Sequence, residues 1–360
     1  MRRLRIALLG LLLAWSVPAE AAGLIERMVR LPVSFGAAGT LALKALIVRP
    51  DDDRRHPLAV LTHGKPGDPR EHATMSPRTM RAQAREFARR GWVTVAFMRR
   101  GYGQSEGRMA EGAGPCSAPE YEKAGRNSAE DVRAVIQAMR NDPHVDDSKV
   151  ISVGRSAGGL AAVALTADPP PGLVAAINFA GGRGRIAPDE VCAPERLVNA
   201  FGAFGRTSRV PMLWIYAEND HYFGPALAKR LHAAFTKAGG RAEFILAPPF
   251  GTDGHALFSA PRAWTAHVDD FLARRGLATA GPLIPLRDEA SVVYPKGLGV
   301  AGREAFLRYL EANDHKAFAI SPKGAFGWRS GRKTVAAAAQ DALAACLRHA
   351  PTCSVAMTDE

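Results

Sequence analysis

The chain has 360 residues, of which 47% are hydrophobic and 23% charged, and its net charge is +12. This balance is typical of a globular protein with one large domain and a small one, and no segment resembles low-complexity disorder. The basic residues are scattered and aromatic residues make up only 7% of the chain. Neither a basic stripe nor a nucleic-acid-binding module is indicated, so no nucleic-acid partner is expected.

The first 22 residues have the pattern of a secretory signal peptide. Three arginines precede an apolar run over residues 6–15, and the small-residue stretch SVPAEAA follows. The apolar run is too short to span a bilayer, and the small residues favour cleavage after Ala21 or Ala22. We therefore expect a secreted or periplasmic protein without integral membrane insertion after cleavage. A membrane anchor is the alternative.

From residue 24 to 277, short apolar runs alternate with amphipathic stretches. Strands are predicted over residues 40–50, 57–64, 92–97, 149–154, 172–182, 211–220 and 242–249. Helices are predicted over residues 80–90, 128–141, 157–167, 225–237 and 263–275. This alternation predicts an α/β fold with a mostly parallel central sheet flanked by helices. Residues 183–209 fit no strand or helix of that sheet, and we expect them to form a small cap over the site.

The pattern changes near Pro282, where GPLIPLRDEA is typical of a linker. Beyond it we expect a helix, a hairpin, an alanine-rich helix and a final strand, which make a small α+β module. The predicted organisation is a signal peptide (1–22), a main domain (23–281) and a C-terminal module (282–360). No activity is assigned to the module.

The chain has four cysteines: Cys116, Cys192, Cys346 and Cys353. An oxidising compartment favours two disulfides, and pairing the last two cysteines with each other is the simplest of the three possible connectivities. A bond between Cys116 and Cys192 would then join the two parts of the cap. Four free thiols are the alternative.

Two stretches read Gly-x-Ser-x-Gly, centred on Ser105 and Ser156. A nucleophilic serine on this motif needs a strained turn between a buried strand and a helix. Ser156 follows the β-branched run KVISVG and precedes the small, apolar run AGGLAAVALTA. The glycine-rich stretch EGRMAEGAGPC follows Ser105 and is unsuited to open a helix. Ser156 is therefore the candidate nucleophile, and Ser105 is interpreted as a loop serine.

A serine hydroxyl needs a base, and the base needs an acid that orients it. On a strand–turn–helix nucleophile these partners follow in the order serine, acid, histidine. Asp220 ends the strand PMLWIYAEND, and His255 lies just after the last strand. They are the predicted acid and base, with Glu218 and Asp253 as rival acids. His221 precedes the last strand and is not expected to be the base.

The oxyanion of an acyl-transfer intermediate needs backbone N–H donors. One is expected from Ala157, which follows the nucleophile, and the other from Lys65 in the loop HGKPG after the second predicted strand. His63 is interpreted as a residue that shapes this loop. The segment RRGYG after the next strand is expected to hold the loop in place rather than to contact substrate.

The segments THGKPG, MRRGYGQSEG, GRSAGG, WIYAENDHYFGP and FGTDGHALF occur in this order. In these segments the chain resembles exported α/β-hydrolases of the dienelactone-hydrolase-like and acetyl-xylan-esterase-like groups, over roughly residues 40–277. Dienelactone hydrolases use a cysteine nucleophile where this chain has Ser156. The resemblance therefore implies an α/β-hydrolase fold and a serine hydrolase.

The leading hypothesis is hydrolysis of small carboxylic esters through an acyl-enzyme on Ser156, with Asp220, His255 and no metal or organic cofactor. A second hypothesis is a serine peptidase of the prolyl-peptidase type. A third is a non-catalytic binding protein on a hydrolase scaffold. The sequence leaves the acyl and alcohol groups, the oligomeric state and the purpose of the C-terminal module open.

Overall fold

The computed structural model describes residues 23–279, 281–286 and 292–359. The predicted signal peptide, residues 1–22, lies outside the described residues. Within the described ranges, no helix combines the length and the apolar character needed to cross a membrane.

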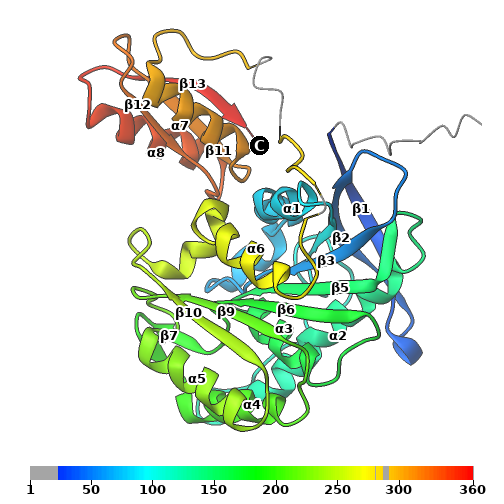
Figure 1. The fold of residues 1–360 in the computed structure, drawn as a ribbon. Helices are drawn as coiled ribbons and strands as arrows, with labels where there is room; N and C mark the ends of the chain where they lie inside the picture. Colours follow the sequence, from blue (N-terminus) through cyan, green and yellow to red (C-terminus); the bar gives the residue numbers. More distant parts are fainter. Residues whose placement is uncertain (1–22, 280, 287–291, 360) are drawn as a thin grey trace, which may run out of the picture.

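The main domain is built on one eight-stranded sheet with the order β1-β2-β4-β3-β5-β6-β9-β10 (Figure 1). The strands are β1 (Leu24–Ser34), β2 (Thr40–Pro50), β3 (His56–Thr62), β4 (Val93–Phe97), β5 (Val145–Arg155), β6 (Leu173–Phe179), β9 (Met212–Ala217) and β10 (Ala242–Ala247). Strand β2 runs antiparallel to β1 and β4, and all other neighbours are parallel. The predicted mostly parallel sheet is confirmed.

Helices cover both faces of the sheet (Figure 1). Helices α1 (Arg81–Ala88) and α6 (Thr265–Ala273) pack on one face, and the other face carries α2 (Tyr121–Met139), α3 (Ala157–Thr166), α4 (Pro194–Gly205) and α5 (Pro225–Lys237). In the central strand β3, Leu58 and Val60 join the core on the α2–α5 side, while Ala59 and Leu61 join the core on the α1 side. Successive side chains of a strand point to opposite faces, so a strand covered on both sides is apolar throughout.

Two elements of the main domain, β1 and α2, differ from the sequence-based expectations. The sequence pattern does not predict strand β1, because charged residues interrupt its apolar run. In the structure, β1 pairs with β2 along its whole length. Helix α2 begins at Tyr121 instead of Ser128, although its first turns contain a glycine. A side chain on Gly125 would lie 2.9 Å from the Phe204 ring, so this glycine permits close packing against α4. The local propensity against a helix is outweighed by that tertiary contact.

The stretch expected to form a cap, residues 183–209, divides into two parts. Strands β7 (Arg185–Ala187) and β8 (Glu190–Val191) form a small two-stranded sheet beside the site. Helix α4, in contrast, packs on α5, and its Leu197, Phe201 and Phe204 are fully buried in the main core. The expectation that the whole stretch lies outside the sheet and its helices is therefore corrected: only the β7–β8 hairpin does.

The C-terminal module has its own three-stranded antiparallel sheet with the order β12-β11-β13. Its elements are α7 (Val300–Glu311), β11 (Lys316–Ile320), β12 (Phe326–Arg329), α8 (Val335–Leu347) and β13 (Ser354–Asp359). Ala317 and Ala319 face α8, whereas Phe318 packs with residues of α7. The predicted helix–hairpin–helix–strand order is thus present in this part of the chain.

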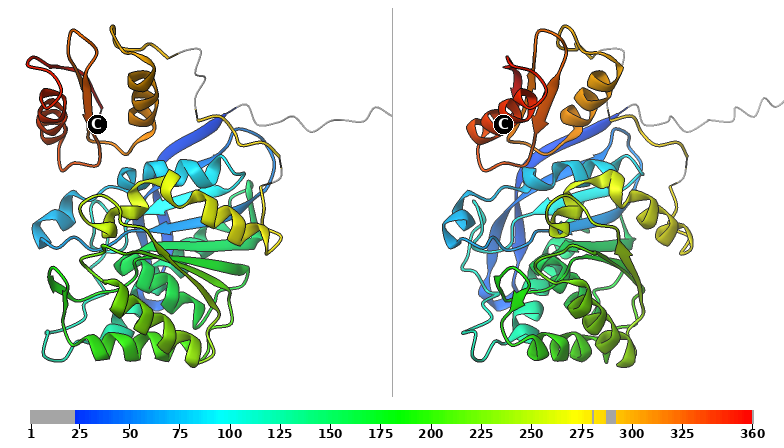
Figure 2. Two further views of the ribbon diagram at one scale, coloured as in Figure 1. Left: turned by 60° about the vertical axis from the view of Figure 1, so that its left-hand side comes forward. Right: turned by 90° about the vertical axis from the view of Figure 1, so that its left-hand side faces the viewer.

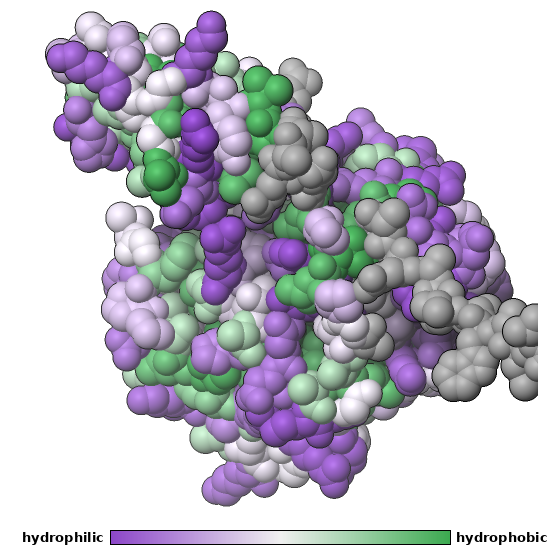
Figure 3. Space-filling view, turned by 45° about the horizontal axis from the view of Figure 1, so that its top comes forward, coloured by the Kyte–Doolittle hydropathy of each residue, from purple (hydrophilic) through white to green (hydrophobic). Residues whose placement is uncertain are grey.

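The module lies on the α1 side of the main domain (Figure 2). Asp314 forms ion pairs with Arg78 (3.3 Å) and Arg81 (3.5 Å), and the Asn313 side chain accepts a hydrogen bond from the backbone N–H of Ala82 (3.1 Å). Hydrophilic side chains gather where the two parts approach each other (Figure 3). This contact is therefore largely polar.

Candidate active site

Ser156 stands on a strained turn between β5 and α3. Its backbone has φ 57° and ψ −122°, a left-handed conformation that costs a non-glycine residue about 1–3 kcal/mol. Glycines allow the turn to close: a side chain on Gly154 would lie 2.0 Å from the Gly158 carbonyl oxygen, and one on Gly158 would lie 2.3 Å from the Thr62 oxygen. The GRSAGG pattern thus produces the sharp strand-to-helix turn on which a nucleophilic serine is presented.

The other Gly-x-Ser-x-Gly segment has a structural role. Ser105 donates its hydroxyl proton to the Met98 carbonyl oxygen (2.7 Å) and accepts a hydrogen bond from the backbone N–H of Lys44 (2.9 Å). These bonds use both the proton and a lone pair of the hydroxyl to hold a loop against β2. The interpretation of Ser105 as a loop serine is confirmed.

Asp220 and His255 are brought together at the carboxyl edge of the sheet. Asp220 follows β9, His255 lies in a short 3₁₀ helix (Gly254–Ser259) after β10, and His255 Nδ1 is 3.1 Å from Asp220 Oδ2. The other carboxylate oxygen of Asp220 accepts the backbone N–H groups of Tyr222 (2.7 Å) and Phe223 (3.0 Å). Both side chains are buried, so the carboxylate fixes the orientation of the imidazole.

The rival polar groups have other partners. Asp253 accepts the backbone N–H groups of His255 (2.9 Å) and His221 (3.1 Å) and so caps the turn that carries His255. Glu218 is exposed. The His221 ring faces Asp189, with Nδ1 3.1 Å from the carboxylate. Of these acids, Asp220 is the one that contacts the His255 ring.

Burial and neighbouring charges set the protonation of this pair. Burial lowers the pKa of His255, and the positive charge of Arg155 lowers it further, against the opposing effect of Asp220. Burial alone would raise the pKa of Asp220, but its hydrogen bonds hold that pKa below the usual value. A neutral imidazole beside an ionised carboxylate is the form that a general base requires.

Ser156 lines a cavity of about 370 Å³ together with Ala157, Lys65, Tyr222 and Phe223. The His255 ring lies beneath this wall, stacked on Tyr222 with ring centroids 3.9 Å apart. Among the described residues, no hydrogen bond joins the Ser156 hydroxyl to the His255 ring. Three of the five predicted site residues, Ser156, Ala157 and Lys65, therefore line one cavity. His255 contacts the wall of that cavity through Tyr222 and Phe223 and is paired with the fifth residue, Asp220.

The loop that carries Lys65 is held by His63. Its Nδ1 is 2.6 Å from the Gly64 carbonyl oxygen, and its Nε2 accepts the backbone N–H of Arg99 (3.1 Å). Burial lowers the pKa of His63 to about 3, and the charge of Arg99 contributes. A side chain on Gly64 would lie 3.0 Å from Ser156 Cβ, so the loop packs directly against the turn that carries Ser156. His63 is thus a neutral loop-shaping residue, as expected.

A buried ion-pair network lies behind the loop. The Arg99 guanidinium donates to the Thr62 hydroxyl (2.7 Å) and the His63 carbonyl oxygen (2.5 Å), and it forms an ion pair with Glu111. Glu111 also accepts hydrogen bonds from Tyr102 (2.6 Å) and Arg183 (3.0 Å). Burial opposes the charged carboxylate, but the two guanidinium groups hold the pKa of Glu111 well below its usual range. The RRGYG segment therefore supports the loop, as predicted.

Sequence reasoning missed Glu111. It lies in the stretch EGRMAEGAGPC, which has no helical or strand periodicity. Its partners lie 9, 12, 17 and 72 residues away in sequence. The only available signal was the need of a buried arginine for a counter-charge, and this does not identify which carboxylate supplies it.

Both predicted disulfides are present. Cys116 is bonded to Cys192, 76 residues apart, and Cys346 is bonded to Cys353, seven residues apart. The first bond joins the segment before α2 to the β7–β8 hairpin, and both of its cysteines line the cavity at Ser156. The second bond ties the end of α8 to the start of β13.

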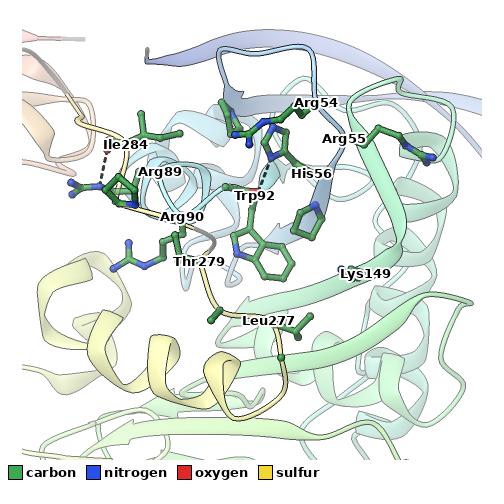
Figure 4. A pocket seen from close by; sticks show the side chains of 16 residues that line it. Arg54, Arg55, His56, Arg89, Arg90, Trp92, Lys149, Leu277, Thr279 and Ile284 are labelled. Atoms are coloured by element: carbon green, nitrogen blue, oxygen red, sulfur yellow. Dashed lines mark hydrogen bonds between the residues drawn. The ribbon is translucent and has the colours of Figure 1, made fainter. Parts of the chain in front are cut away.

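A second hollow, of about 270 Å³, lies at the opposite, amino-terminal edge of the strands (Figure 4). Most of its basic side chains are paired with carboxylates. Arg54 pairs with Asp52 (2.9 Å), and Arg90 pairs with Asp269 (2.6 Å). Ligands of open α/β sheets bind at the carboxyl ends of the strands, so the cavity at Ser156 is the candidate active site.

Comparisons with known proteins identify the family and the fold. A family model for X-Pro dipeptidyl-peptidases (S15 family) matches residues 39–234. No curated protein matches the chain. Among solved structures, a sarin-phosphonylated esterase 2 of Thermogutta terrifontis is similar at 20% identity, covering 73% of this chain and 99% of that chain with a TM-score of 0.51.

Two further solved structures are similar to the chain. Esterase Pf2001 of Pyrococcus furiosus is 15% identical, covering 70% of this chain and 91% of its own, with a TM-score of 0.50. A putative dienelactone hydrolase of Klebsiella pneumoniae is also 15% identical, covering 70% and 98%, with a TM-score of 0.48. At 15–20% identity, the likeness to the two esterases shows the α/β-hydrolase fold alone. The family match spans more than half of the chain and includes the Ser156 turn, so the chain belongs to the X-Pro dipeptidyl-peptidase (S15) family and is a serine hydrolase.

Proposed function

We propose that the protein hydrolyses small carboxylic esters through an acyl-enzyme intermediate. His255 takes the proton of the Ser156 hydroxyl as the oxygen attacks the ester carbonyl, and it then gives the proton to the leaving alcohol. Asp220 holds the imidazole in one tautomer and offsets the positive charge that develops. Water attacks the acyl-enzyme by the same route and releases the acid.

The developing oxyanion would be held by two backbone N–H groups. Ala157 is the first residue of α3, where the helix dipole favours negative charge. Lys65 lies in the loop that packs on the Ser156 turn, and it lines the same cavity as Ser156 and Ala157. Losing one such donor raises the barrier by about 3 kcal/mol.

The observation that carries the proposal is the left-handed backbone of Ser156 in a cavity whose wall covers a buried aspartate–histidine pair. Such strain persists in a fold where the surroundings enforce it, and it concentrates at functional sites. The serine–histidine hydrogen bond of hydrolases commonly tightens only in the complex with substrate. The side-chain geometry described above is therefore compatible with the proposed roles.

The test compares two matched serine variants from the two Gly-x-Ser-x-Gly segments. Ser156→Ala should lower the turnover of p-nitrophenyl acetate by at least about a thousandfold, with an unchanged circular dichroism spectrum. Ser105→Ala should keep turnover within a few-fold and lose about 1–3 kcal/mol of stability, because it removes both hydrogen bonds of a buried hydroxyl. Equal activity of Ser156→Ala and the parent protein would refute the proposal.

The family match favours a second candidate function, a peptidase that uses the same residues. Gly-Pro-p-nitroanilide and p-nitrophenyl acetate distinguish the two, because the anilide requires cleavage of an amide. A third candidate is a non-catalytic binding protein. Labelling of the folded protein by a fluorophosphonate probe at Ser156 would exclude that role, and failure to label would favour it.

We also propose that the protein is secreted or periplasmic after signal cleavage. The two disulfides support this location, because such bonds persist in oxidising compartments. N-terminal sequencing of the exported protein should find a first residue at position 22 or 23. An N-terminus at Met1 in the exported protein would contradict the proposal.

A further inference from the structure

We propose that the active-site cavity selects substrates that carry a negative charge, with Arg185 and Lys65 as the groups that receive it and Arg183 behind them. This inference rests on the proposed function, because it names the substrate class of the same site: carboxylic esters that also carry a free carboxylate. Three observations carry it, namely the residues of the cavity wall, the surroundings of Arg185 and the surroundings of Lys65.

The cavity wall is cationic. It contains three basic side chains, those of Lys65, Arg183 and Arg185, and no Asp or Glu among the described residues that line it. The hollow at the other edge of the sheet differs, because most of its arginines have carboxylate partners. Arg183 pairs with Glu111 (3.0 Å), so the charges of this wall without a carboxylate partner among the described residues are those of Lys65 and Arg185. A ligand of opposite sign is attracted to such a wall.

Arg185 is held in place without a counter-charge. Its guanidinium carbon lies 4.2 Å from the centroid of the Tyr222 ring, the same ring that stacks on His255. Its Nε is buried and has no hydrogen-bond partner in the described chain. Asp189, in the turn of the same hairpin, contacts His221 instead (3.1 Å), and Asp220 contacts His255 (3.1 Å). Arg185 therefore lies beside the reacting groups, and its guanidinium N–H groups are available to bind an anion.

Lys65 has no ion-pair partner among the described residues. Burial lowers the pKa of its ammonium group, and the positive charge of Arg183 lowers it further. Glu111 acts in the opposite direction on the pKa of Lys65, but this carboxylate is shared by Arg99 and Arg183, so two guanidinium groups face it. A substrate anion between Lys65 and Arg185 would relieve this repulsion and gain charge-assisted hydrogen bonds.

The same charges disfavour a substrate with a free ammonium group near the scissile bond. Such a group would meet three cations and no carboxylate of the wall, and like charges at close range repel. The cationic wall therefore favours the ester hypothesis over any activity that depends on recognition of a free N-terminus.

The kinetic test uses two substrates of matched size, monomethyl succinate and its neutral amide, methyl succinamate, with hydrolysis followed by release of acid. The parent protein should favour the anionic ester in kcat/KM by at least about tenfold, and Arg185→Gln should reduce this ratio towards one. Arg206→Gln, which changes an exposed arginine after α4, is the matched control and should leave the ratio unchanged. A ratio near one in the parent protein would overturn the inference.

A binding test separates this inference from the proposed function. Calorimetric titration of succinate into Ser156→Ala should detect binding, whereas neutral succinamide should not bind. Adding Arg185→Gln to the same variant should abolish the binding of succinate. If Ser156 is labelled by a fluorophosphonate but succinate does not bind and the ratio is near one, the inference fails and the esterase proposal stands. If no ester is hydrolysed but succinate binds through Arg185, the anion site stands and the esterase proposal fails.

Discussion

Tyr222 lies flat against His255, with ring centroids 3.9 Å apart and ring planes 6° apart. The contact limits the motion of the imidazole, which Asp220 holds through Nδ1, and aromatic stacking of this kind contributes about 0.5–1.5 kcal/mol. Tyr222→Leu should therefore lower kcat for ester hydrolysis by up to about tenfold, while Tyr222→Phe, which keeps the ring, should retain it. Equal kcat values for the two variants would show that stacking does not position His255.

Arg155 should control the acidic limb of the pH–rate profile. Burial, Arg155, Asp220 and Asp253 act on His255, and the net result is a pKa below the ordinary value of about 6.5. Because the base must be neutral, kcat/KM should fall only at a pH below about 6.5. Arg155→Gln removes a positive charge that disfavours the imidazolium, so the midpoint of this limb should move to higher pH. The pH dependence of kcat/KM measures the shift, with Arg206→Gln as a control that should leave the midpoint in place.

The Glu111 carboxylate should be a major source of stability. Glu111→Gln would leave Arg99 and Arg183 buried without their counter-charge, at a cost of about 3–5 kcal/mol in the free energy of unfolding. Tyr102→Phe removes one hydrogen bond to the same group and should cost about 1–3 kcal/mol. Urea unfolding of both variants checks the order, and a smaller loss for Glu111→Gln than for Tyr102→Phe would contradict this account.

The network should also make stability depend on pH. The pKa of Glu111 is held well below its usual value in the folded state. Its contribution is therefore complete above the unfolded pKa of about 4.3 and is lost as the pH falls below that value. The difference in stability between the parent protein and Glu111→Gln should accordingly shrink on acidification.

Two glycines should respond to alanine in opposite directions. A side chain on Gly158 would lie 2.3 Å from the Thr62 oxygen and 2.6 Å from the His63 oxygen, so Gly158→Ala must separate the nucleophile turn from the loop that carries Lys65. Activity and stability should both fall. Gly202 in α4 has its nearest neighbour at 3.6 Å, and Gly202→Ala should raise stability by up to about 1 kcal/mol through helix propensity. Thermal unfolding and ester turnover measure both effects.

Much of the fold could be predicted because local pattern and tertiary structure agree there. The run KVISVG supplies apolar side chains to the cores on both faces of the sheet, as a strand between two helical layers must. The glycines around Ser156 are required because a side chain on Gly154 or Gly158 would lie 2.0–2.3 Å from a backbone oxygen. The pairing of Asp220 with His255 followed from chain order, because both follow strands that end at the same edge of the sheet.

The remainder depends on contacts that no local pattern encodes. The sequence pattern places helix α4 in the cap because residues 183–209 fit no strand or helix of the predicted sheet, and its packing on α5 reveals it as core. Glu111 and Arg185 derive their significance from groups distant in sequence: the former from Arg99 and Arg183, the latter from the Tyr222 ring. Such residues become recognisable once the chain is folded.

The Cys116–Cys192 bond forms part of the wall that surrounds Ser156. Preparation of the protein therefore affects its chemistry as well as its stability. Material produced in a reducing cytosol would lack this covalent closure, and the hairpin that carries Arg185 would lose its tether to the segment before α2. Substrate profiles measured on such material would describe an altered enzyme, so recombinant production should be directed to the periplasm or followed by oxidative refolding.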